Sequence, residues 1–395
     1  MTHPQPRFGV PPDLARDAAR QLLIDLVAIP SHGANEGPIL DYLAKRFRRQ
    51  DIPFRVTEAG GEPLNLTAEI GQGNRAIILN SHVDTVPPGD PALWQTDPLV
   101  PTEKGGRIYG RGAEDAKGCL AAMIVAFEAL AARREQLPVR VVLMAVGAEE
   151  RGGLGTKLEV ANGFRADAAI VGESTLLEPK LAHKGVLRLE VEVKGKAAHA
   201  SDPEAGVNAV VAMAPVISAL DRLAAEVRTR RERHTGQASL VISTIAGGVA
   251  LNVIPASCVI SIDRRVLPTE TEDQAREEIV RTVTAALPTG LGAAVEVRTV
   301  RFVAPSATAE GAPIVRAAER AASELLGKPV RASGFTATCD MTYLVNEGSI
   351  PSIILGPDSI GLAHQVDECI SIDEMTRAVL LYLRTIELWA ADQGT

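Results

Sequence analysis

The feature that most constrains the fold of this 395-residue chain is a series of short, almost entirely apolar runs. They occupy residues 76–81, 139–146, 168–171 and 353–355. A strand that is apolar on both faces is typical of a parallel sheet that is covered by helices on both sides. These runs therefore predict the central strands of such a sheet.

Segments with helical periodicity accompany the apolar runs. Their apolar side chains recur every three or four positions. They lie at residues 13–29, 36–49, 119–134, 312–326 and 373–391. The alternation of the two patterns predicts an α/β fold, with a mostly parallel sheet flanked by helices.

The pattern changes after Lys184. Residues 188–193 alternate strictly between charged and apolar side chains, which indicates a strand with one buried face. Further helices and strands are predicted at residues 208–229, 240–245, 259–265, 271–286 and 295–300. Their β-α-β-β-α-β order predicts a ferredoxin-like α+β domain at residues 185–300, inserted into a larger domain made of residues 1–184 and 301–395.

Composition argues against several classes of protein. The net charge of −8 disfavours a nucleic-acid or anionic-membrane partner. The four cysteines are far apart in the sequence, which predicts free thiols in a reducing compartment. Residues 1–10 do not resemble a signal peptide, and no apolar run reaches the roughly 18 residues of a membrane span. We therefore expect a soluble, cytoplasmic protein.

Side chains that can bind metals follow the predicted strands. In chain order they are His82, Glu150, Glu173 and His364, and Asp115 joins them from a glycine-rich loop at residues 110–118. Each alone is also typical of a solvated loop. However, ligands of open α/β sheets bind beyond the carboxyl ends of the strands, and the adjacent carboxylates of Glu149 and Glu150 repel unless a cation or a proton separates them. The nitrogen and oxygen ligands suit zinc, cobalt or manganese.

Five motifs carry a family resemblance. They are S-H-V-D-T-V-P at 81–87, G-R-G-A-E-D-A-K-G at 110–118, G-A-E-E at 147–150, G-E-S at 172–174 and A-H-Q-V-D-E at 363–368. With them the chain resembles the M20 metallopeptidase family over nearly its whole length. Residues 182–185, 195–203, 206–209 and 356–360 are most similar to the acetylornithine deacetylase branch.

The resemblance implies a catalytic domain with two divalent metal ions, zinc first, with cobalt and manganese as alternatives. Asp115 would bridge the ions. His82 and Glu173 would complete one site, and Glu150 and His364 the other. The resemblance also makes Glu149 the general base, lets Asp84 orient His82, and implies a cis peptide between Asp115 and Ala116.

For the inserted domain the resemblance implies a lid that also forms a homodimer. His199 would reach the substrate from the partner subunit and stabilise the oxyanion. Arg265 would bind the substrate carboxylate bidentately, as guanidinium geometry favours. Asn252 would help to position the substrate.

The implied activity is removal of an acyl group from the nitrogen of a small-molecule amino acid, with acetylornithine deacetylase as the first expectation. Glutamate at position 173 favours acyl-amino-acid substrates. Thr338, Cys339 and Asp340 resemble instead the desuccinylase pattern, so a succinyl-diaminopimelate desuccinylase or another N-acyl-amino-acid hydrolase is the alternative. A dipeptidase or carboxypeptidase comes next. A binding protein with an inactive site is disfavoured, because every proposed ligand and Glu149 are present.

Overall fold

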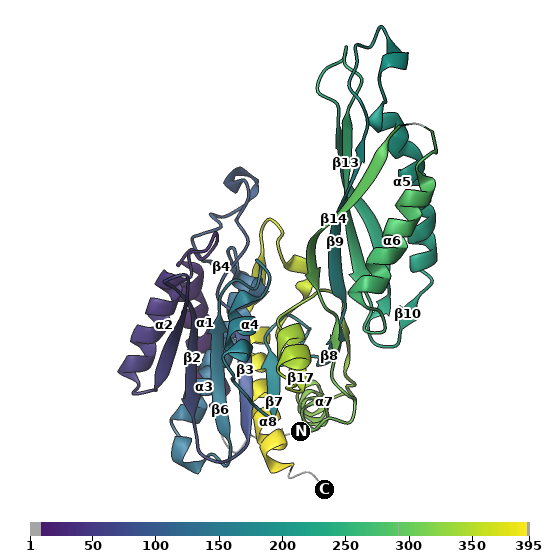
Figure 1. The fold of residues 1–395 in the computed structure, drawn as a ribbon. Helices are drawn as coiled ribbons and strands as arrows, with labels where there is room; N and C mark the ends of the chain where they lie inside the picture. Colours follow the sequence, from purple (N-terminus) through teal and green to yellow (C-terminus); the bar gives the residue numbers. More distant parts are fainter. Residues whose placement is uncertain (1–8, 291, 393–395) are drawn as a thin grey trace. The chain divides into compact units, whose positions relative to one another are not determined.

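The computed structural model describes residues 9–290 and 292–392, which form two compact units (Figure 1). The first unit contains the chain up to Leu181, Ala307–Ser333 and the chain from Cys339 onward. The second contains Ala182–Ser306 and Gly334–Thr338. The second unit therefore interrupts the first in the sequence. Most of the N-terminal segment considered for a signal peptide, residues 1–8, lies outside the described residues.

The first unit is organised around a nine-stranded sheet with the order β1-β2-β6-β3-β7-β17-β8-β15, in which β16 also pairs with β8. The strands are β1 (Phe54–Ala59), β2 (Glu62–Ile70), β3 (Ala76–His82), β6 (Arg140–Val146), β7 (Ala168–Val171), β8 (Lys180–His183), β15 (Ser306–Ala307), β16 (Ser333–Phe335) and β17 (Ser352–Ile354). The four central strands β6, β3, β7 and β17 are parallel. Their carboxyl ends consequently lie at one edge of the sheet. A small separate sheet contains β4 (Thr102–Lys104), β5 (Arg107–Tyr109) and β18 (Cys369–Ser371).

Helices cover both faces of the large sheet. They are α1 (Pro12–Val27), α2 (Gly37–Arg49), α3 (Gly118–Ala131), α4 (Leu154–Ala161), α7 (Pro313–Leu326) and α8 (Ile372–Ala391). Successive side chains of a strand point to opposite faces. Asn80 of β3 donates a hydrogen bond to Thr156 of α4, whereas its neighbour Ser81 lies on the same side as Met123 of α3. The predicted α/β fold, with a mostly parallel sheet between helices, is confirmed.

Several elements of this unit were missed by the sequence patterns, among them helix α4 and strand β2. Helix α4 has only eight residues and follows Gly152 and Gly153, which are poor helix formers, so its periodicity was too short to recognise. Strand β2 carries polar residues on buried positions, among them Asn65, which is fully buried. Its amide donates to the carbonyl of Gly155 and to Glu159, and these bonds make its burial acceptable.

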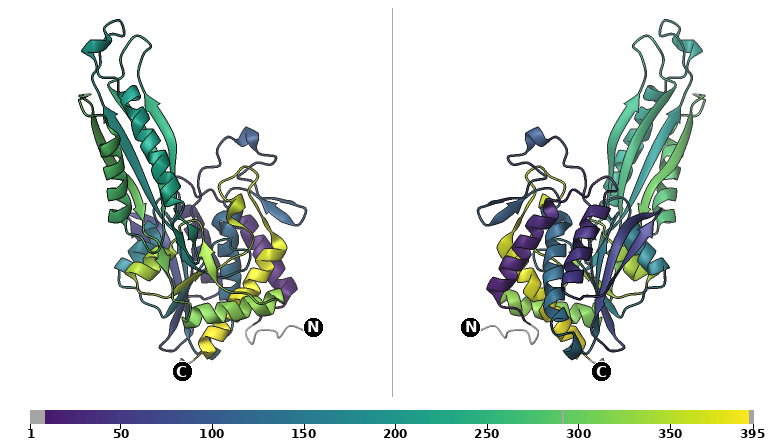
Figure 2. Two further views of the ribbon diagram at one scale, coloured as in Figure 1. Left: turned by 90° about the vertical axis from the view of Figure 1, so that its right-hand side faces the viewer. Right: turned by 90° about the vertical axis from the view of Figure 1, so that its left-hand side faces the viewer.

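The second unit is a four-stranded antiparallel sheet with the order β12-β13-β9-β14. Its elements are β9 (Gly185–Lys194), α5 (Ala209–Val227), β12 (Ser239–Gly247), β13 (Ser257–Val266), α6 (Glu272–Ala286) and β14 (Ala294–Val303), with a short hairpin of β10 (Arg231–Glu232) and β11 (Gly236–Gln237). Helices α5 and α6 lie side by side on one face (Figure 2). The core between helices and sheet is aliphatic, and alternate residues of β13 point into it.

All four cysteines are free, as predicted, and all four are buried. The reducing compartment inferred from them stays a prediction. Among the helices within residues 9–290 and 292–392, none combines the length and the apolar character needed to cross a membrane.

Candidate metal centre

The candidate centre lies at the carboxyl edge of the four parallel strands. His82 is the last residue of β3, Glu149 and Glu150 occupy the turn after β6, and Glu173 follows β7 by two residues. His364 lies in the loop after β17. Parallel pairing alone therefore gathers residues that are far apart in the sequence.

Asp115 reaches the same edge from the turn before α3. Gly112 opens this turn with φ of +81°, a conformation that residues with a side chain rarely adopt. A Cβ at this glycine would also collide with the side chain of Thr85. The peptide bond between Asp115 and Ala116 is cis, as the resemblance implied.

The five predicted ligands come together in two groups that share Asp115. His82, Asp115 and Glu173 form one group, and Asp115, Glu150 and His364 form the other, with one ligand atom per residue and all atoms of a group within 4.8 Å of one another. The Nε2 atom of His82 lies 3.1 Å from Oδ1 of Asp115 and 3.9 Å from Glu173. The Nε2 atom of His364 lies 3.2 Å from Oδ2 of Asp115 and 3.0 Å from Glu150. Each oxygen of Asp115 thus faces a different histidine.

The electrostatics of this cluster fit divalent cations. Burial raises the pKa of Glu173 well above its usual value, and the nearby charge of Asp115 raises it further. Burial disfavours a charged His82, yet its hydrogen bond to Asp115 and the charge of Glu173 raise its pKa well above the usual value. Carboxylates at such a site are stabilised by positive charge. Imidazole and carboxylate ligands in groups of three are also the usual protein ligands of zinc and similar metals.

The two groups differ in their access to solvent. His82 and Glu173 are buried, whereas the side chain of His364 is 53% exposed. Hydrogen bonds to Asp115 and Glu150 raise the pKa of His364 to about 10. The second group therefore forms the open side of the centre.

Asp84 is fully buried, and its carboxylate binds main-chain amides. Oδ1 accepts from the N–H of Glu149 at 3.1 Å, and Oδ2 accepts from the N–H of Glu150 at 3.2 Å. The sequence predicted that this carboxylate orients His82. In the structure, Nδ1 of His82 lies 2.9 Å from the main-chain carbonyl oxygen of Asp84 and 3.7 Å from its carboxylate. The ring is thus held mainly by the backbone of Asp84, and the carboxylate holds the Glu149–Glu150 turn.

Glu149 lies in that turn but belongs to neither ligand group. Desolvation raises its pKa well above the usual value, and the nearby carboxylates of Asp340 and Glu150 raise it further, against the effect of His82. A carboxylate with a raised pKa is suited to accepting and returning a proton near neutral pH.

Three residues around the Asp115 loop received no role from the sequence. Lys117 is buried, and its ammonium group donates to the carbonyls of Leu26 and Ile29 at 3.0 and 2.9 Å. Burial lowers its pKa to about 7. Arg111 and Glu368 form a buried ion pair. All three lie inside the quoted motifs, but a motif does not show which backbone groups a side chain binds.

In the second unit, two of the three predicted substrate residues are neighbours. His199 forms an isolated bridge with Val253, and the N–H of Ala200 donates to the carbonyl of Asn252 at 3.0 Å. Both His199 and Asn252 are exposed. Their positions in the sequence gave no sign of this contact.

Arg265 lies at the other end of the same sheet. It is the ninth residue of β13 and pairs with Ser239 at the start of β12, whereas Asn252 lies in the connection between these strands. At about 3.3 Å per residue, the two ends of β13 are roughly 30 Å apart. The Nε atom of Arg265 donates to Asp263 at 2.8 Å, and its neighbour Arg264 is buried.

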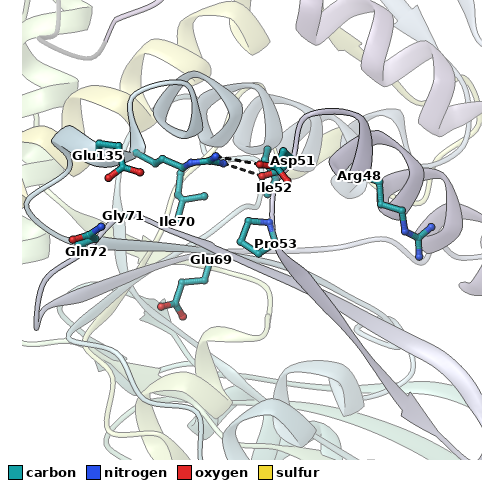
Figure 3. Close-up of a pocket in the computed structure, with 10 residues that line it drawn as sticks. Arg48, Asp51, Ile52, Pro53, Glu69, Ile70, Gly71, Gln72 and Glu135 are labelled. Atoms are coloured by element: carbon teal, nitrogen blue, oxygen red, sulfur yellow. Dashed lines mark hydrogen bonds and ion pairs between the residues drawn. The ribbon is translucent and has the colours of Figure 1, made fainter.

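The cavity drawn in Figure 3 is unrelated to this centre. It has a volume of about 530 Å³, and Glu69 and Ile70 of β2 line it. These residues pair with Val142 and Val141 near the start of β6, so the cavity lies at the opposite edge of the sheet. Arg134 and Asp51, which also line it, already bind each other.

The family model of peptidase family M20/M25/M40 matches residues 78–388. The chain belongs to this family. The predicted family is thereby confirmed, and this M20 chain is a hydrolase of amide bonds from a metal-dependent family.

Curated relatives cover most of the M20 chain. The acetylornithine deacetylase of Myxococcus xanthus is 33% identical and covers 93% of this chain and 97% of its own length. That of Pasteurella multocida is 32% identical over 85% of both chains. A probable succinyl-diaminopimelate desuccinylase of Staphylococcus epidermidis is 26% identical and covers 93% of this chain and 95% of its own.

Solved structures show the same fold. An M20 family metallo-carboxypeptidase, Sso-CP2 from Sulfolobus solfataricus, matches with a TM-score of 0.79 and 20% identity over 94% of this chain and 99% of its own. YXEP of Bacillus subtilis, described as a dinuclear metal binding peptidase from the M20 family, matches with a TM-score of 0.72 and 18% identity over 95% and 98%. At these identities the likeness concerns the fold.

Proposed function

We propose that this M20 chain is a dinuclear metal-dependent amidohydrolase that removes the acyl group from an N-acyl amino acid, and that N-acetylornithine is its substrate. The observation that carries the proposal is the position of Asp115, whose two oxygens lie 3.1 and 3.2 Å from two different histidines. The acetylornithine deacetylases that are 32–33% identical to the chain support the choice of substrate.

In this proposal His82, Asp115 and Glu173 hold one metal ion, and Asp115, Glu150 and His364 hold the other. Zinc suits these ligands, and cobalt and manganese are the alternatives. When bound, such ions lower the pKa of water and stabilise negative charge on an amide oxygen.

Glu149 acts as the general base. It accepts a proton from the attacking water and delivers it to the departing nitrogen, and its raised pKa favours the first of these transfers. Asp84 keeps Glu149 in place, because its carboxylate binds the N–H of Glu149. General acid–base catalysis of this kind typically accelerates a reaction by roughly 10²–10⁴-fold.

The second unit supplies substrate contacts in a homodimer. His199 stabilises the oxyanion and Asn252 positions the substrate, both from the partner subunit, while Arg265 binds the substrate carboxylate. The separation of roughly 30 Å along β13 supports this division, since one small molecule cannot contact both ends of one sheet. Asp263 already binds Arg265, so the substrate carboxylate would compete with it.

The surface of β12 supports the dimer. This strand is at the edge of its sheet and carries Val241 and Ile245, which are 54% and 59% exposed. An unpaired edge strand with apolar side chains readily pairs with another chain. Sedimentation of the purified protein tests this part, and a monomer at assay concentration would rule out the roles of His199 and Asn252 in the partner's site.

Succinyl-diaminopimelate is the second candidate substrate. It is favoured by the relatives of that description and by the Thr338–Asp340 stretch. However, Asp340 is buried and accepts a hydrogen bond from Thr156 at 2.6 Å. Its carboxylate therefore binds helix α4, and this structural role gives the motif less weight as a sign of substrate choice. Dipeptides are the third candidate class.

The deciding experiment compares N-acetylornithine, N-succinyl-diaminopimelate and dipeptides as substrates. Each is tested with metal-free protein and with protein refilled with zinc or cobalt. We expect metal-dependent release of acetate from N-acetylornithine. Faster turnover of either other class would replace the proposed substrate, and a protein that binds no metal would refute the mechanism.

A further inference from the structure

Glu368 is a buried carboxylate, 1% exposed, that follows His364 by four residues. One of its oxygens, Oε1, accepts hydrogen bonds from two successive main-chain amides. These are the N–H groups of Glu114 at 2.9 Å and of Asp115 at 3.1 Å. Glu368 therefore holds the backbone of the residue that belongs to both ligand groups.

The other oxygen of Glu368 binds Arg111, which lies on the Asp115 loop. Nη1 of Arg111 donates to Oε2 at 2.5 Å, and both side chains are buried. Nη2 of Arg111 lies 3.5 Å from the carbonyl oxygen of His364. The guanidinium group packs over the ring of Trp94, 5.1 Å from its centroid. Arg111 thus contacts both the segment that carries His364 and the carboxylate that holds Asp115.

Main-chain contacts strengthen this link. The N–H of Gly110 donates to the carbonyl of Glu368 at 3.0 Å. Residues 110–115 and 364–368 are therefore linked both by a main-chain hydrogen bond and by the Arg111–Glu368 ion pair. Each of the two segments carries one proposed ligand, Asp115 or His364.

Asp84 performs the same task for another part of the centre. Its two oxygens bind the successive amides of Glu149 and Glu150, as those of Glu368 bind the Asp115 loop and Arg111. Hydrogen bonds to an ionised carboxylate are stronger than those between neutral groups, so they fix the backbone that they bind. His82 and Glu173 need less of this support, because a strand end places each of them.

We propose that Glu368, together with Arg111, is a positioning residue for the metal centre. It sets Asp115 and His364 at the distance that the open ligand group needs. This inference rests on the ligand set of the proposed function. Glu368 belongs to neither ligand group, and both of its oxygens accept hydrogen bonds from N–H groups. Loss of such supporting partners typically lowers metal affinity by about 10–100-fold.

The test compares the variants Glu368→Gln and Arg111→Lys with the wild type. A glutamine has one oxygen, so it cannot bind both the amides and Arg111. A lysine keeps the charge of Arg111 but lacks the fork that reaches two acceptors. Arg111→Lys also leaves the bonds from Glu368 to the Asp115 loop, so it reports on the pair even if Glu368→Gln does not fold.

Metal-free proteins are titrated with Co²⁺, and binding is followed by calorimetry and by the visible absorption of the bound cobalt. We expect two equivalents in the wild type. In both variants the dissociation constant of the second equivalent should rise about 10–100-fold, and that of the first should rise less, because His82 and Glu173 keep their positions at strand ends. Folded variants that bind both equivalents with wild-type constants would overturn the inference.

Glu128→Gln is the matched control. Glu128 pairs with Arg46 at 2.6 and 2.8 Å near the far end of α3, so this variant also breaks an arginine–glutamate pair, here a partly buried one. We expect a lower unfolding temperature with unchanged cobalt binding. If the control bound the second cobalt ion as weakly as the Glu368 and Arg111 variants do, the effect would be one of general stability, and the inference would be overturned. Wild-type protein that binds two equivalents but hydrolyses no N-acyl amino acid would refute the proposed function and leave this test intact.

Discussion

His82 and His183 are both buried at the ends of strands, yet their environments have opposite effects on the imidazole. His82 lies among carboxylates, and its pKa is raised well above the usual value despite burial. His183 is fully buried, and its Nδ1 lies 2.8 Å from the carbonyl oxygen of Lys184. Burial lowers its pKa to about 4.

The comparison shows what makes a buried histidine a candidate ligand. Burial alone favours the neutral ring at both positions. Only at the carboxyl edge of the sheet do strand ends bring negative charges against the ring, and the same charges attract a metal ion. His183 belongs to the 182–185 stretch that resembles the deacetylase branch, but its surroundings offer it no such role. Four predictions test this contrast, from the largest expected effect to the smallest.

Replacing Asp115 should have the largest effect, because it contributes an oxygen to each ligand group. We expect Asp115→Ala to lose both metal ions and all measurable hydrolysis. Metal content of dialysed protein and turnover of N-acetylornithine provide the measurement. Retention of two tightly bound metals per chain would show that the groups do not depend on the shared carboxylate.

Glu149→Gln should separate catalysis from metal binding. The variant keeps a similar shape but cannot accept a proton, so kcat should fall by about 10²–10⁴-fold. Because Glu149 belongs to neither ligand group, the metal content should stay at two ions per chain. Wild-type kcat in a metal-loaded variant would eliminate Glu149 as the base.

His183 should make stability depend on pH. Its folded pKa of about 4 is below the usual value near 6.5, so the unfolded chain binds more protons between these values. The contribution of His183 to the free energy of unfolding should therefore be fully present above pH 6.5 and should decrease as the pH falls toward 4. The loss contributed by this residue between pH 7.5 and 5 should be about 2 kcal/mol.

Chemical denaturation of the wild type and His183→Gln at both pH values measures this contribution. The variant can be less stable at every pH, but its stability should decrease less on acidification. Identical changes in the two proteins would mean that His183 is not buried as a neutral ring.

Gly112→Ala and Gly163→Ala should destabilise the protein to different degrees, because only the second site has room for a Cβ atom. Both glycines have positive φ, +81° and +87°, but a Cβ at Gly112 would meet the side chains of Thr85 and Lys117, while the space at Gly163 is open. Gly163→Ala should cost about 1–2 kcal/mol of unfolding free energy, because alanine disfavours this conformation. Gly112→Ala should cost more and also weaken metal binding. Equal costs and unchanged metal affinity would contradict the structure of the Asp115 loop.

Much of the centre could be predicted from the sequence. The apolar runs located β3, β6, β7 and β17, and residues next to strand ends then followed as candidates. Neighbouring parallel strands have their carboxyl ends at one edge of the sheet, so the fold class alone predicted that these candidates come together. Helix α4 and strand β2 escaped because one is very short and the other buries polar residues.

The supporting contacts could not be predicted. The motifs contain Asp84, Arg111 and Glu368, but spacing does not show whether a carboxylate binds a ring, an amide or a guanidinium group. Asp84 illustrates this, because its carbonyl rather than its carboxylate lies against His82. The separation of Arg265 from Asn252 depended likewise on the register of β12 and β13.

The sequence by itself therefore determined the fold class, the family and the kinds of side chain at the strand ends, because side-chain periodicity and residue type are local properties of a chain. Only the tertiary structure decided which groups the supporting side chains bind, as where Glu368 accepts hydrogen bonds from the main chain of Glu114 and Asp115. Those relations depend on backbone dihedral angles in loops and on partners more than a hundred residues away, since hydrogen bonds form between groups that folding brings within about 3 Å.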